Sequence, residues 1–577
     1  MTVHTATSPT PSTVAAKLPQ LASRRERIDL GDGLVMRWST AEDKDALIEC
    51  HAYAFQFETM GRTIPEGQLP GKNEYVTALT ARLMTGQHPL MTEYDFALVE
   101  DTNILQAPKP GQTPRPLVVA ATCLMLVSGF YGSIDMGWGI PEAVGTRPEY
   151  RGRGLVKRLF LDMIHPAAEA RGDLMLLIAG IPYFYKQFGY ENGVPATSFR
   201  HLKNVTALYP PSLPNKRLPR FTLREATSSD LPYLVRLSQP NRLFSKAKMG
   251  TYYDLKFWTF VVETLARENI YNYYDAHHHA AIVVDSKTGK DVGISLTGVM
   301  MFGGNWNWKI FSLDQDQMND DEEYAVTYRD AMASVLSQLK EFDRPYYECY
   351  SAKLNNNTLP LESETTLRTR NEFPAHNFTN ISIGLPPTHP VTLLLDSRKQ
   401  IDPAREPYRF YTRIPSLPKF LLKIAPVLEE RVKESGVWRD VSARLQVDFY
   451  QKLEGMSGRG LEVVLKRGKV VEANDWKPKS PEQEAREAVE RFHARKQSVS
   501  AESDSEEKED DKGEDKEVVL SAGLKPLMFT RLVTGETSLD ELLKRETENY
   551  VGSGEAKLLL EVLFPAKDEF NLDLMWL

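Results

Sequence analysis

The chain has 577 residues, 42% of them hydrophobic and 26% charged, and its formal net charge is -8 at pH 7. A chain of this length should hold about three or four globular domains. The charge shows no basic stripe for nucleic acid, and no apolar run is long enough to cross a membrane. Three cysteines, odd in number and far apart, argue for a reducing compartment and against a disulfide or zinc framework.

Residues 1–27 are expected to form a disordered tail. They are rich in serine and threonine and carry basic but no acidic residues before Glu26, as a mitochondrial transit peptide would. Three prolines between positions 9 and 19 favour a simple tail instead. The predicted location is therefore the cytoplasm, with the mitochondrion as the alternative.

Two proline-rich seams, residues 209–221 and 384–407, divide the rest of the chain into three blocks. The predicted blocks are residues 28–215, 216–400 and 401–577. The first two begin alike, each with a short strand, a Ser/Thr/Asp cap and a helical pattern. This similarity predicts a repeated domain.

The third block contains an acidic segment at about residues 478–516. Between Glu502 and Glu517 stand ten acidic residues against three lysines. Such a composition cannot bury an apolar face, so we expect a disordered insertion.

The sequence TRPEYRGRGLVKRL, residues 146–159, places two glycines between arginines at the start of an amphipathic stretch. Apolar runs before it predict buried strands. After Gly154 apolar residues recur every four positions, as in a helix. Glycines at such a turn let backbone N–H groups surround an anion, and the helix N-terminus adds a favourable dipole. We therefore expect Arg151, Gly152, Arg153 and Gly154 to bind a diphosphate.

Two familiar phosphate loops do not fit this turn. The three-glycine spacing of a dinucleotide fingerprint is absent, and no Lys-Ser/Thr pair follows as in nucleoside triphosphatases.

A second motif, YFYKQFGYE at residues 183–191, follows another predicted strand. The two motifs together resemble the GNAT acetyltransferase superfamily, whose acyl-CoA loop reads Arg/Gln-x-x-Gly-x-Gly/Ala and whose later helix reads Phe-Tyr-x-x-x-Gly-Phe/Tyr. Residues 151–156 fit the loop except at Val156, which replaces a small residue. The enhanced-intracellular-survival (Eis) branch is similar here too, because its loops continue with a larger apolar residue. The second pattern is matched by Phe184, Tyr185, Gly189 and Tyr190.

The resemblance implies an α/β (α+β) protein with tandem GNAT-like domains, the second degenerate, followed by a domain similar to sterol carrier proteins. The second block agrees, because acidic residues including Asp314 and Asp316 stand where its anion loop should be and would repel a diphosphate. The resemblance also implies acetyl-CoA as co-substrate and a homo-oligomer. No metal is expected, and His277, His278 and His279 are predicted to lie in a loop.

Amine acetylation needs a proton donor for the departing thiolate, a donor for the oxyanion and a way to deprotonate the amine. Tyr185 is the predicted general acid, because a phenol can protonate a thiolate as its charge develops. Val144 and Thr146 should lie along the pantetheine arm, and Gly145 and Leu155 are assigned to the same acetyl-CoA site.

The base has two candidates. The resemblance to the Eis branch implies the terminal carboxylate of Leu577, and Glu142 occupies the strand position where other GNAT enzymes hold a base. The favoured function is acetyl transfer to primary amines, either aminoglycoside-like polyamines or protein lysines. The alternative is a non-catalytic acyl-CoA or lipid-binding protein.

Overall fold

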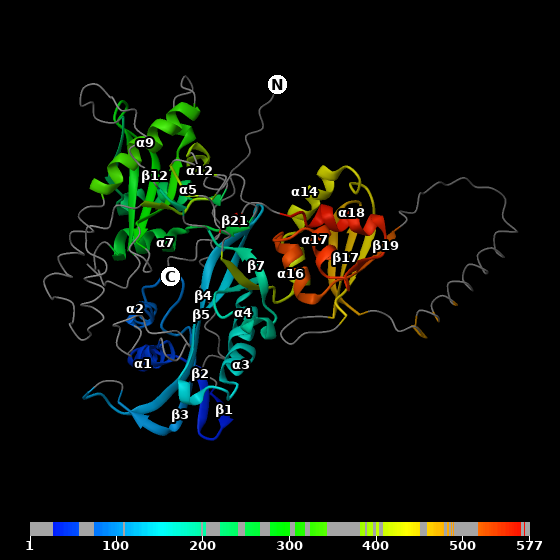
Figure 1. Ribbon diagram of the computed structural model, residues 1–577, viewed down its shortest axis with the longest axis horizontal. Coiled ribbons are helices and arrows are strands. Elements are labelled where there is room, and N and C mark those ends of the chain that lie inside the picture. Colours follow the sequence, from blue (N-terminus) through cyan, green and yellow to red (C-terminus); the bar gives the residue numbers. More distant parts are fainter. Residues whose placement is uncertain are drawn as a thin grey trace.

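The computed structural model describes the following residues: 27–56, 74–107, 110–197, 200–202, 220–240, 249–265, 277–299, 306–317, 324–342, 381–386, 389–395, 400–402, 408–450, 459–477, 517–566, 570–571 and four single positions between 482 and 489. The predicted N-terminal tail and most of the acidic insertion lie outside these ranges. The described residues form three β-sheets, each with its own helices (Figure 1). None of the helices in these ranges is long and apolar enough to span a membrane.

The first sheet has the strand order β1-β2-β3-β4-β5-β6-β15-β7, with β10 and β21 at the side of β4. Its strands are β1 (Ile28–Gly31), β2 (Leu34–Trp38), β3 (Phe96–Gln106), β4 (Arg115–Tyr131), β5 (Ile134–Thr146), β6 (Met175–Ile178), β7 (Glu191–Pro195), β10 (Met249–Thr251), β15 (Arg409–Arg413) and β21 (Phe570–Asn571). Its helices are α1 (Lys44–Ala54), α2 (Glu74–Leu83), α3 (Leu155–Arg158), α4 (His165–Arg171) and the short 3-10 helix η6 (Phe184–Phe188).

Helices cover both faces of the first sheet, α1 and α2 on one side and α3 and α4 on the other (Figure 1). Alternate residues of a strand point to opposite faces. Accordingly, Leu98 of β3 joins the core under α1 and α2, whereas Ala97 and Val99 join the core under α3 and α4. The long hairpin of β4 and β5 is buried on both faces, which explains its nearly continuous apolar sequence.

The helix predicted after Gly154 is continuous from α3 to α4 through a π-helical turn, Leu159–Ile164. A spacing of four residues would carry an apolar stripe about 40° around an ideal α-helix at each step. The wider π turn offsets this drift, and all four apolar residues of the pattern are buried. These residues are Leu155, Leu159, Met163 and Ala167.

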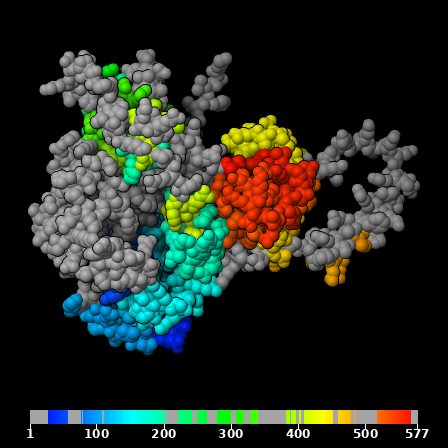
Figure 2. Space-filling model, in the orientation of Figure 1, coloured from blue at the N-terminus to red at the C-terminus, as the bar shows by residue number. Residues whose placement is uncertain are grey.

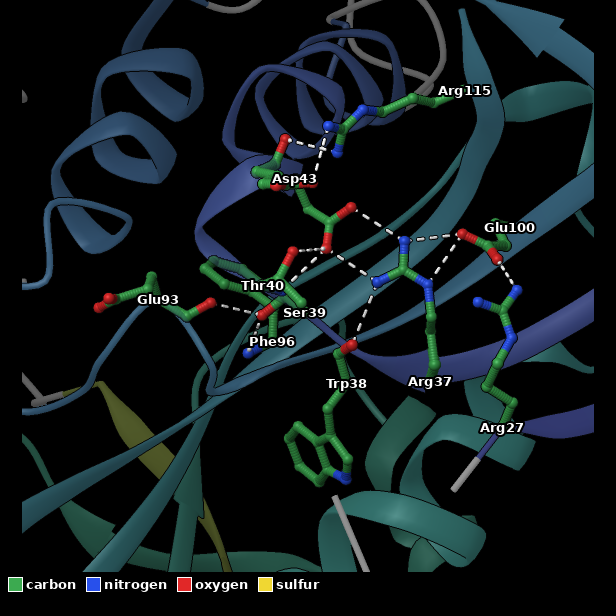
Figure 3. A network of polar contacts seen from close by, with 11 residues as sticks. Arg27, Arg37, Trp38, Ser39, Thr40, Asp43, Glu93, Phe96, Glu100 and Arg115 are labelled. Carbon is green, nitrogen blue, oxygen red and sulfur yellow. Dashed lines mark hydrogen bonds and ion pairs between the residues drawn. The ribbon is translucent and has the colours of Figure 1, made fainter. Parts of the chain in front are cut away.

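A buried ion network ties the start of α1 to the first sheet (Figure 3). The guanidinium of Arg37 lies 2.8 Å from Asp43 and 2.7 Å from Glu100. Asp43 also accepts from the backbone N–H and the hydroxyl of Thr40, which closes a capping box. Burial by itself would raise the pKa of Asp43, but the contact with Arg37 lowers it below its usual value. The network fixes where the helix leaves β2.

The second sheet has the order β8-β14-β13-β12-β11-β9. Its elements are β8 (Arg200–His201), β9 (Phe221–Glu225), β11 (His277–Asp285), β12 (Lys290–Val299), β13 (Trp306–Leu313), β14 (Ile381–Ile383), and the helices α5 (Leu231–Leu237), α7 (Leu255–Thr259), α9 (Tyr324–Phe342) and α12 (Pro390–Leu394). The prediction of a loop at His277 to His279 is wrong, because these residues open β11 and pair with β12. They lie at the open end of the hairpin that β11 forms with β12, where the strand continues through all three histidines.

The second sheet repeats the ion network of the first. Arg224 lies 2.8 Å from Asp230 and 2.7 Å from Asp291, and Thr227 closes the same capping box with Asp230. The spacing from arginine to capping aspartate is six residues in both copies. This correspondence extends the similarity that the sequence shows between the two blocks.

The third sheet has the order β18-β17-β16-β19-β20. Its elements are β16 (Ala443–Asp448), β17 (Gly460–Lys466), β18 (Lys469–Trp476), β19 (Val518–Gly523), β20 (Tyr550–Val551), and the helices α13 (Leu417–Lys423), α14 (Ala425–Ser435), α16 (Pro526–Thr534), α17 (Leu539–Arg545) and α18 (Gly554–Leu563). Figure 2 shows this yellow-to-red part against the cyan part of the first block. At that contact the hydroxyl of Tyr131 donates to the carbonyl of Val533 over 2.9 Å.

The sheets do not follow the predicted block boundaries strictly. Strand β15 belongs by sequence to the third block, yet it pairs with β6 and β7 of the first sheet. Strands β10 and β21 are likewise paired next to β4. The first sheet is therefore assembled from all three blocks.

Candidate active site

A cavity of about 980 Å³ opens between β5 and β6. These parallel strands pair only at Trp138 with Met175 and at Gly139 with Leu176, and then separate. The cavity is lined by the end of β5, the arginine-glycine turn, the start of α3, the turn after β6 and η6. A long molecule can therefore insert between the two strands.

A β-bulge shapes the wall of the cavity on β5. Ala121 pairs with Gly145 and Cys123 pairs with Glu142, so Ala143 and Val144 lie opposite a single residue of β4. Ala143 has a φ of 52°, in the left-handed region that side chains other than glycine rarely adopt. A bulge leaves one residue outside the ladder, so it supplies backbone groups without strand partners next to the cavity.

Gly145 lets α1 approach β5 closely. A Cβ atom at this position would lie 3.0 Å from the Cβ of Ala54, 3.0 Å from Cδ2 of His51 and 3.1 Å from Cε2 of Phe55. His51 is itself buried against the strand, and burial lowers its pKa to about 4. Gly145 thus serves the packing of the wall as well as lining the cavity.

The two glycines of the turn are required by their backbone conformation. Gly152 has a φ of 77° and Gly154 a φ of 73°, while a Cβ at either position would meet nothing within 4 Å. Other residues are strained at such φ values. Both glycines lie at the rim of the cavity, and the helix that starts at Leu155 directs its N-terminus there. This geometry suits a diphosphate.

The two arginines of the turn have different surroundings. Arg151 lines the cavity and donates from Nη2 to the carbonyl of Ala54 over 2.9 Å and from Nε to that of Thr146 over 3.3 Å. Arg153 does not line the cavity; its guanidinium stacks over the ring of Tyr150 at 4.7 Å. Arg151 therefore ties the turn to α1 and β5, and Arg153 contributes its charge from the rim.

Tyr185 reaches the cavity from η6 with only 4% of its surface exposed. Its ring contacts Phe184 at 5.2 Å and Phe160 at 5.9 Å between centroids. A Cβ at Gly180 would lie 3.1 Å from the hydroxyl of Tyr185, so the glycine leaves room for it. Burial, followed by the nearby charge of Glu142, raises the pKa of Tyr185 above its usual range.

Glu142 faces the same cavity from β5 and is half-buried. Its Oε1 accepts from the backbone N–H of Ala143 over 3.1 Å, within the bulge. Burial raises the pKa of Glu142, although the hydrogen bond from Ala143 opposes the shift. A carboxyl with a raised pKa can exchange protons closer to neutral pH.

The cavity brings together most of the residues predicted from the sequence. The residues of its lining that the sequence predicted are Glu142, Val144, Gly145, Thr146, Arg151, Gly152, Gly154, Leu155 and Tyr185. Val156, which departs from the family pattern, also lines it. Leu577 lies outside the described residues. Within the described part of the chain, no group of three or more His, Cys, Asp or Glu side chains could hold a metal ion.

Sequence reasoning missed two tyrosines on β15 or next to it. The hydroxyl of Tyr408 accepts from the backbone N–H of Gly180 over 2.9 Å, and that of Tyr411 accepts from Tyr183 over 2.7 Å. More than 220 residues separate each pair, and no local signal connects them. Only the register of β15 against β6 does so.

The mixed sheet thus opens beside a glycine turn and a helix N-terminus, an arrangement that suits a long ligand with a diphosphate. Residues 36–193 match a family model described as the acetyltransferase (GNAT) domain. The predicted resemblance to the GNAT acetyltransferase superfamily, whose members use acetyl-CoA, is therefore confirmed for this part of the chain.

Solved structures match nearly the whole chain. A GCN5-related N-acetyltransferase from Kribbella flavida is 14% identical, with a TM-score of 0.52 over 93% of this chain and 97% of that chain. One from Anabaena variabilis is 11% identical, with a TM-score of 0.52 over 93% and 99%. Eis1 from Mycobacterium abscessus is 10% identical, with a TM-score of 0.46 over 93% and 99%. No curated protein matches. At these identities the first two similarities show a shared fold.

Proposed function

We propose that this protein transfers the acetyl group of acetyl-CoA to a primary amine, with Tyr185 as general acid. The observation that carries the proposal is the cavity itself, which gathers the left-handed glycine turn, the bulge of β5, Glu142 and Tyr185. A bound acetyl-CoA would supply an activated thioester, with its diphosphate at Gly152 and Gly154 and its pantetheine arm along Val144 and Thr146.

The surroundings of Tyr185 suit a proton donor. A phenol is protonated at neutral pH, and the hydroxyl of Tyr185 lies beside Gly180 at the cavity, so its proton is placed where a thiolate can take it up as its charge develops. An oxyanion on the same wall would need an N–H donor, and because the N–H of Ala143 is donated to Glu142, the other bulge residue, Val144, is the candidate.

Glu142 is one candidate for deprotonating the amine. Its carboxyl lines the cavity, and a base works best when its pKa approaches the operating pH. The terminal carboxylate of Leu577 is the other candidate. β21 pairs in parallel with β10, which runs antiparallel to β4, so the chain at Asn571 heads along β4 towards Cys123, the partner of Glu142.

The other blocks support a chain with one active site. We propose that the second block is a degenerate GNAT-like domain. Its Asp314, at the end of β13, is fully buried and paired with Arg236, where an anion-binding turn would need exposed N–H groups. We propose that the third block is similar to sterol carrier proteins. From the family resemblance we also expect a homo-oligomer in the cytoplasm, with aminoglycoside-like polyamines or protein lysines as acceptors.

The test is thiol release from acetyl-CoA by the purified chain, with a panel of polyamines, aminoglycosides and lysine peptides. We expect release with at least one amine, and a loss of about 100-fold or more in kcat for Tyr185→Phe. Tyr450→Phe is the matched control, because its hydroxyl donates to the backbone carbonyl of Glu548 in the third block and it does not line the cavity. Tight acetyl-CoA binding without release to any amine would instead favour a non-catalytic acyl-CoA-binding protein.

A further inference from the structure

Strand β15 is an insertion in the first sheet, next to the cavity. It runs antiparallel to both β6 and β7, with Tyr411 opposite Ile178 and Thr412 opposite Leu177. Ile178 is the last residue of β6 and lines the cavity, so β15 is adjacent to the turn that follows it. A strand from the third block thus borders the candidate active site.

Two tyrosine hydroxyls from this region hold the turn between β6 and η6. Tyr408 accepts the N–H of Gly180 over 2.9 Å, and Tyr411 accepts that of Tyr183 over 2.7 Å. Gly180 has a φ of 152° and Tyr183 a φ of 65°. A left-handed tyrosine is strained and persists only where its surroundings fix it. The two hydrogen bonds are placed at the two unusual backbone positions of the turn.

The conformation of this turn, which the two hydrogen bonds restrain, determines where Tyr185 enters the cavity. Tyr183 is the N-cap residue of η6, and Tyr185 follows in the first turn of that helix. The ring of Tyr411 also lies 5.9 Å from that of Tyr185, centroid to centroid. Tyr411 itself is 5% exposed, so its hydroxyl is held in one place by the core.

We propose that Tyr411 and, more weakly, Tyr408 are positioning residues for the acetyl-transfer step, acting through the turn Gly180–Tyr183 on Tyr185. The proposal rests on the proposed function. It makes catalysis in the first block depend on a strand that the third block supplies. Tyr408 has the smaller share because it is 49% exposed, and water can replace its hydroxyl at Gly180.

The test is a double-mutant cycle on kcat for thiol release. Tyr411→Phe keeps the ring and removes the acceptor for Tyr183, and we expect kcat to fall about tenfold, since small misplacements of a catalytic group are costly. KM for acetyl-CoA should stay within about twofold, because the glycine turn is elsewhere. In the Tyr185→Phe background the same substitution should cost less than about twofold, because the group that it positions has already been removed. Tyr408→Phe should cost about threefold in the wild type.

A further readout separates positioning from simple loss of structure. Hydrogen–deuterium exchange of peptides spanning Gly180 to Tyr185 should accelerate in Tyr411→Phe and not in the control Tyr450→Phe. An equal loss of kcat in both backgrounds, or no loss for either single variant, would overturn the proposal while leaving the proposed function intact. No thiol release by the wild-type chain would overturn the proposed function, and this proposal with it. If Tyr411→Phe fails to fold, the same double-mutant cycle on kcat with Tyr408→Phe tests the proposal.

Discussion

Replacing Glu142 by glutamine tests the catalytic assignment most directly, because it removes the charge and keeps the shape. The Oε1 atom of glutamine can still accept from Ala143, as the carboxylate does over 3.1 Å, so the bulge should survive. If Glu142 deprotonates the amine, kcat should fall by about 100- to 10,000-fold. Affinity for acetyl-CoA should change little, because the glycine turn is intact.

The same substitution should stabilise the fold at neutral pH. Burial raises the pKa of Glu142 in the folded chain above its unfolded value. A carboxyl shifted in this direction favours folding below the unfolded pKa, and that contribution is lost as the pH rises through the folded pKa. Each unit of the shift costs about 1.4 kcal/mol once the group is ionised. Glu142→Gln should therefore melt at a higher temperature than the wild type at pH 8, and the difference should vanish near pH 4.

The assay is thiol release between pH 5 and pH 9. The wild-type rate of thiol release should increase as the pH rises past the raised pKa of Glu142, because the carboxyl then loses its proton. The rate of the variant should not show this increase at low pH. Glu149→Gln is the control, since Glu149 is exposed beside the same turn. Full activity of Glu142→Gln with an unchanged pH profile would refute the assignment. If extending the chain beyond Leu577 then abolishes turnover, the terminal carboxylate is the base.

Three further predictions concern binding and stability. Arg153→Glu should weaken acetyl-CoA binding more than tenfold, because it replaces attraction by repulsion at the rim of the cavity. An affinity for acetyl-CoA equal to that of the wild type, measured by calorimetry, would contradict this prediction. Gly145→Ala should lower the free energy of unfolding by about 1–3 kcal/mol, because the new methyl group overpacks α1; a denaturation midpoint equal to that of the wild type would count against it. Stability should fall as the pH drops below about 6.5, because burial lowers the pKa of His51 and of His389 to about 4 and the unfolded chain then binds more protons. A flat melting temperature from pH 6.5 to pH 4.5 would refute that reading.

The sequence predicted those parts of the candidate site whose residues lie close together in the chain and follow a recognisable pattern. The glycine turn, its arginines and the following helix lie within one stretch, residues 146–167, and each has a local cause. Gly152 and Gly154 occupy left-handed positions, and Leu155 begins the buried stripe. The family match over residues 36–193 agrees with this part of the interpretation.

The parts that the sequence did not predict depend on pairing between distant segments. Strand β15 has only five residues, and nothing in RFYTR indicates that it pairs with β6 rather than with a strand of its own block. The bulge at Ala143 likewise exists only in the register of β5 against β4. Strand register is set by tertiary packing, so Tyr411 could not be assigned to the site from its neighbours in sequence.

The second sheet has counterparts to some features of the first sheet around the candidate site. Asp314 follows β13 as Arg147 follows β5, and each donates its backbone N–H to the neighbouring strand over 2.8 Å. Five residues before these positions stand Lys309 and Glu142, each next to a register shift of its strand pair. Lys309 is 4% exposed and lies 3.2 Å from His278.

A buried ammonium in the place of the carboxylate cannot accept a proton from an amine while it is charged. The second sheet therefore keeps the ion network at the start of its helix and has neither the carboxylate nor the glycine turn, as we propose for a degenerate copy. The backbone at this point differs as well, because Ala143 has a left-handed φ of 52° and no residue of β13 has a positive φ. The second sheet thus lacks both the carboxylate and the bulge conformation that the proposed chemistry of the first would use.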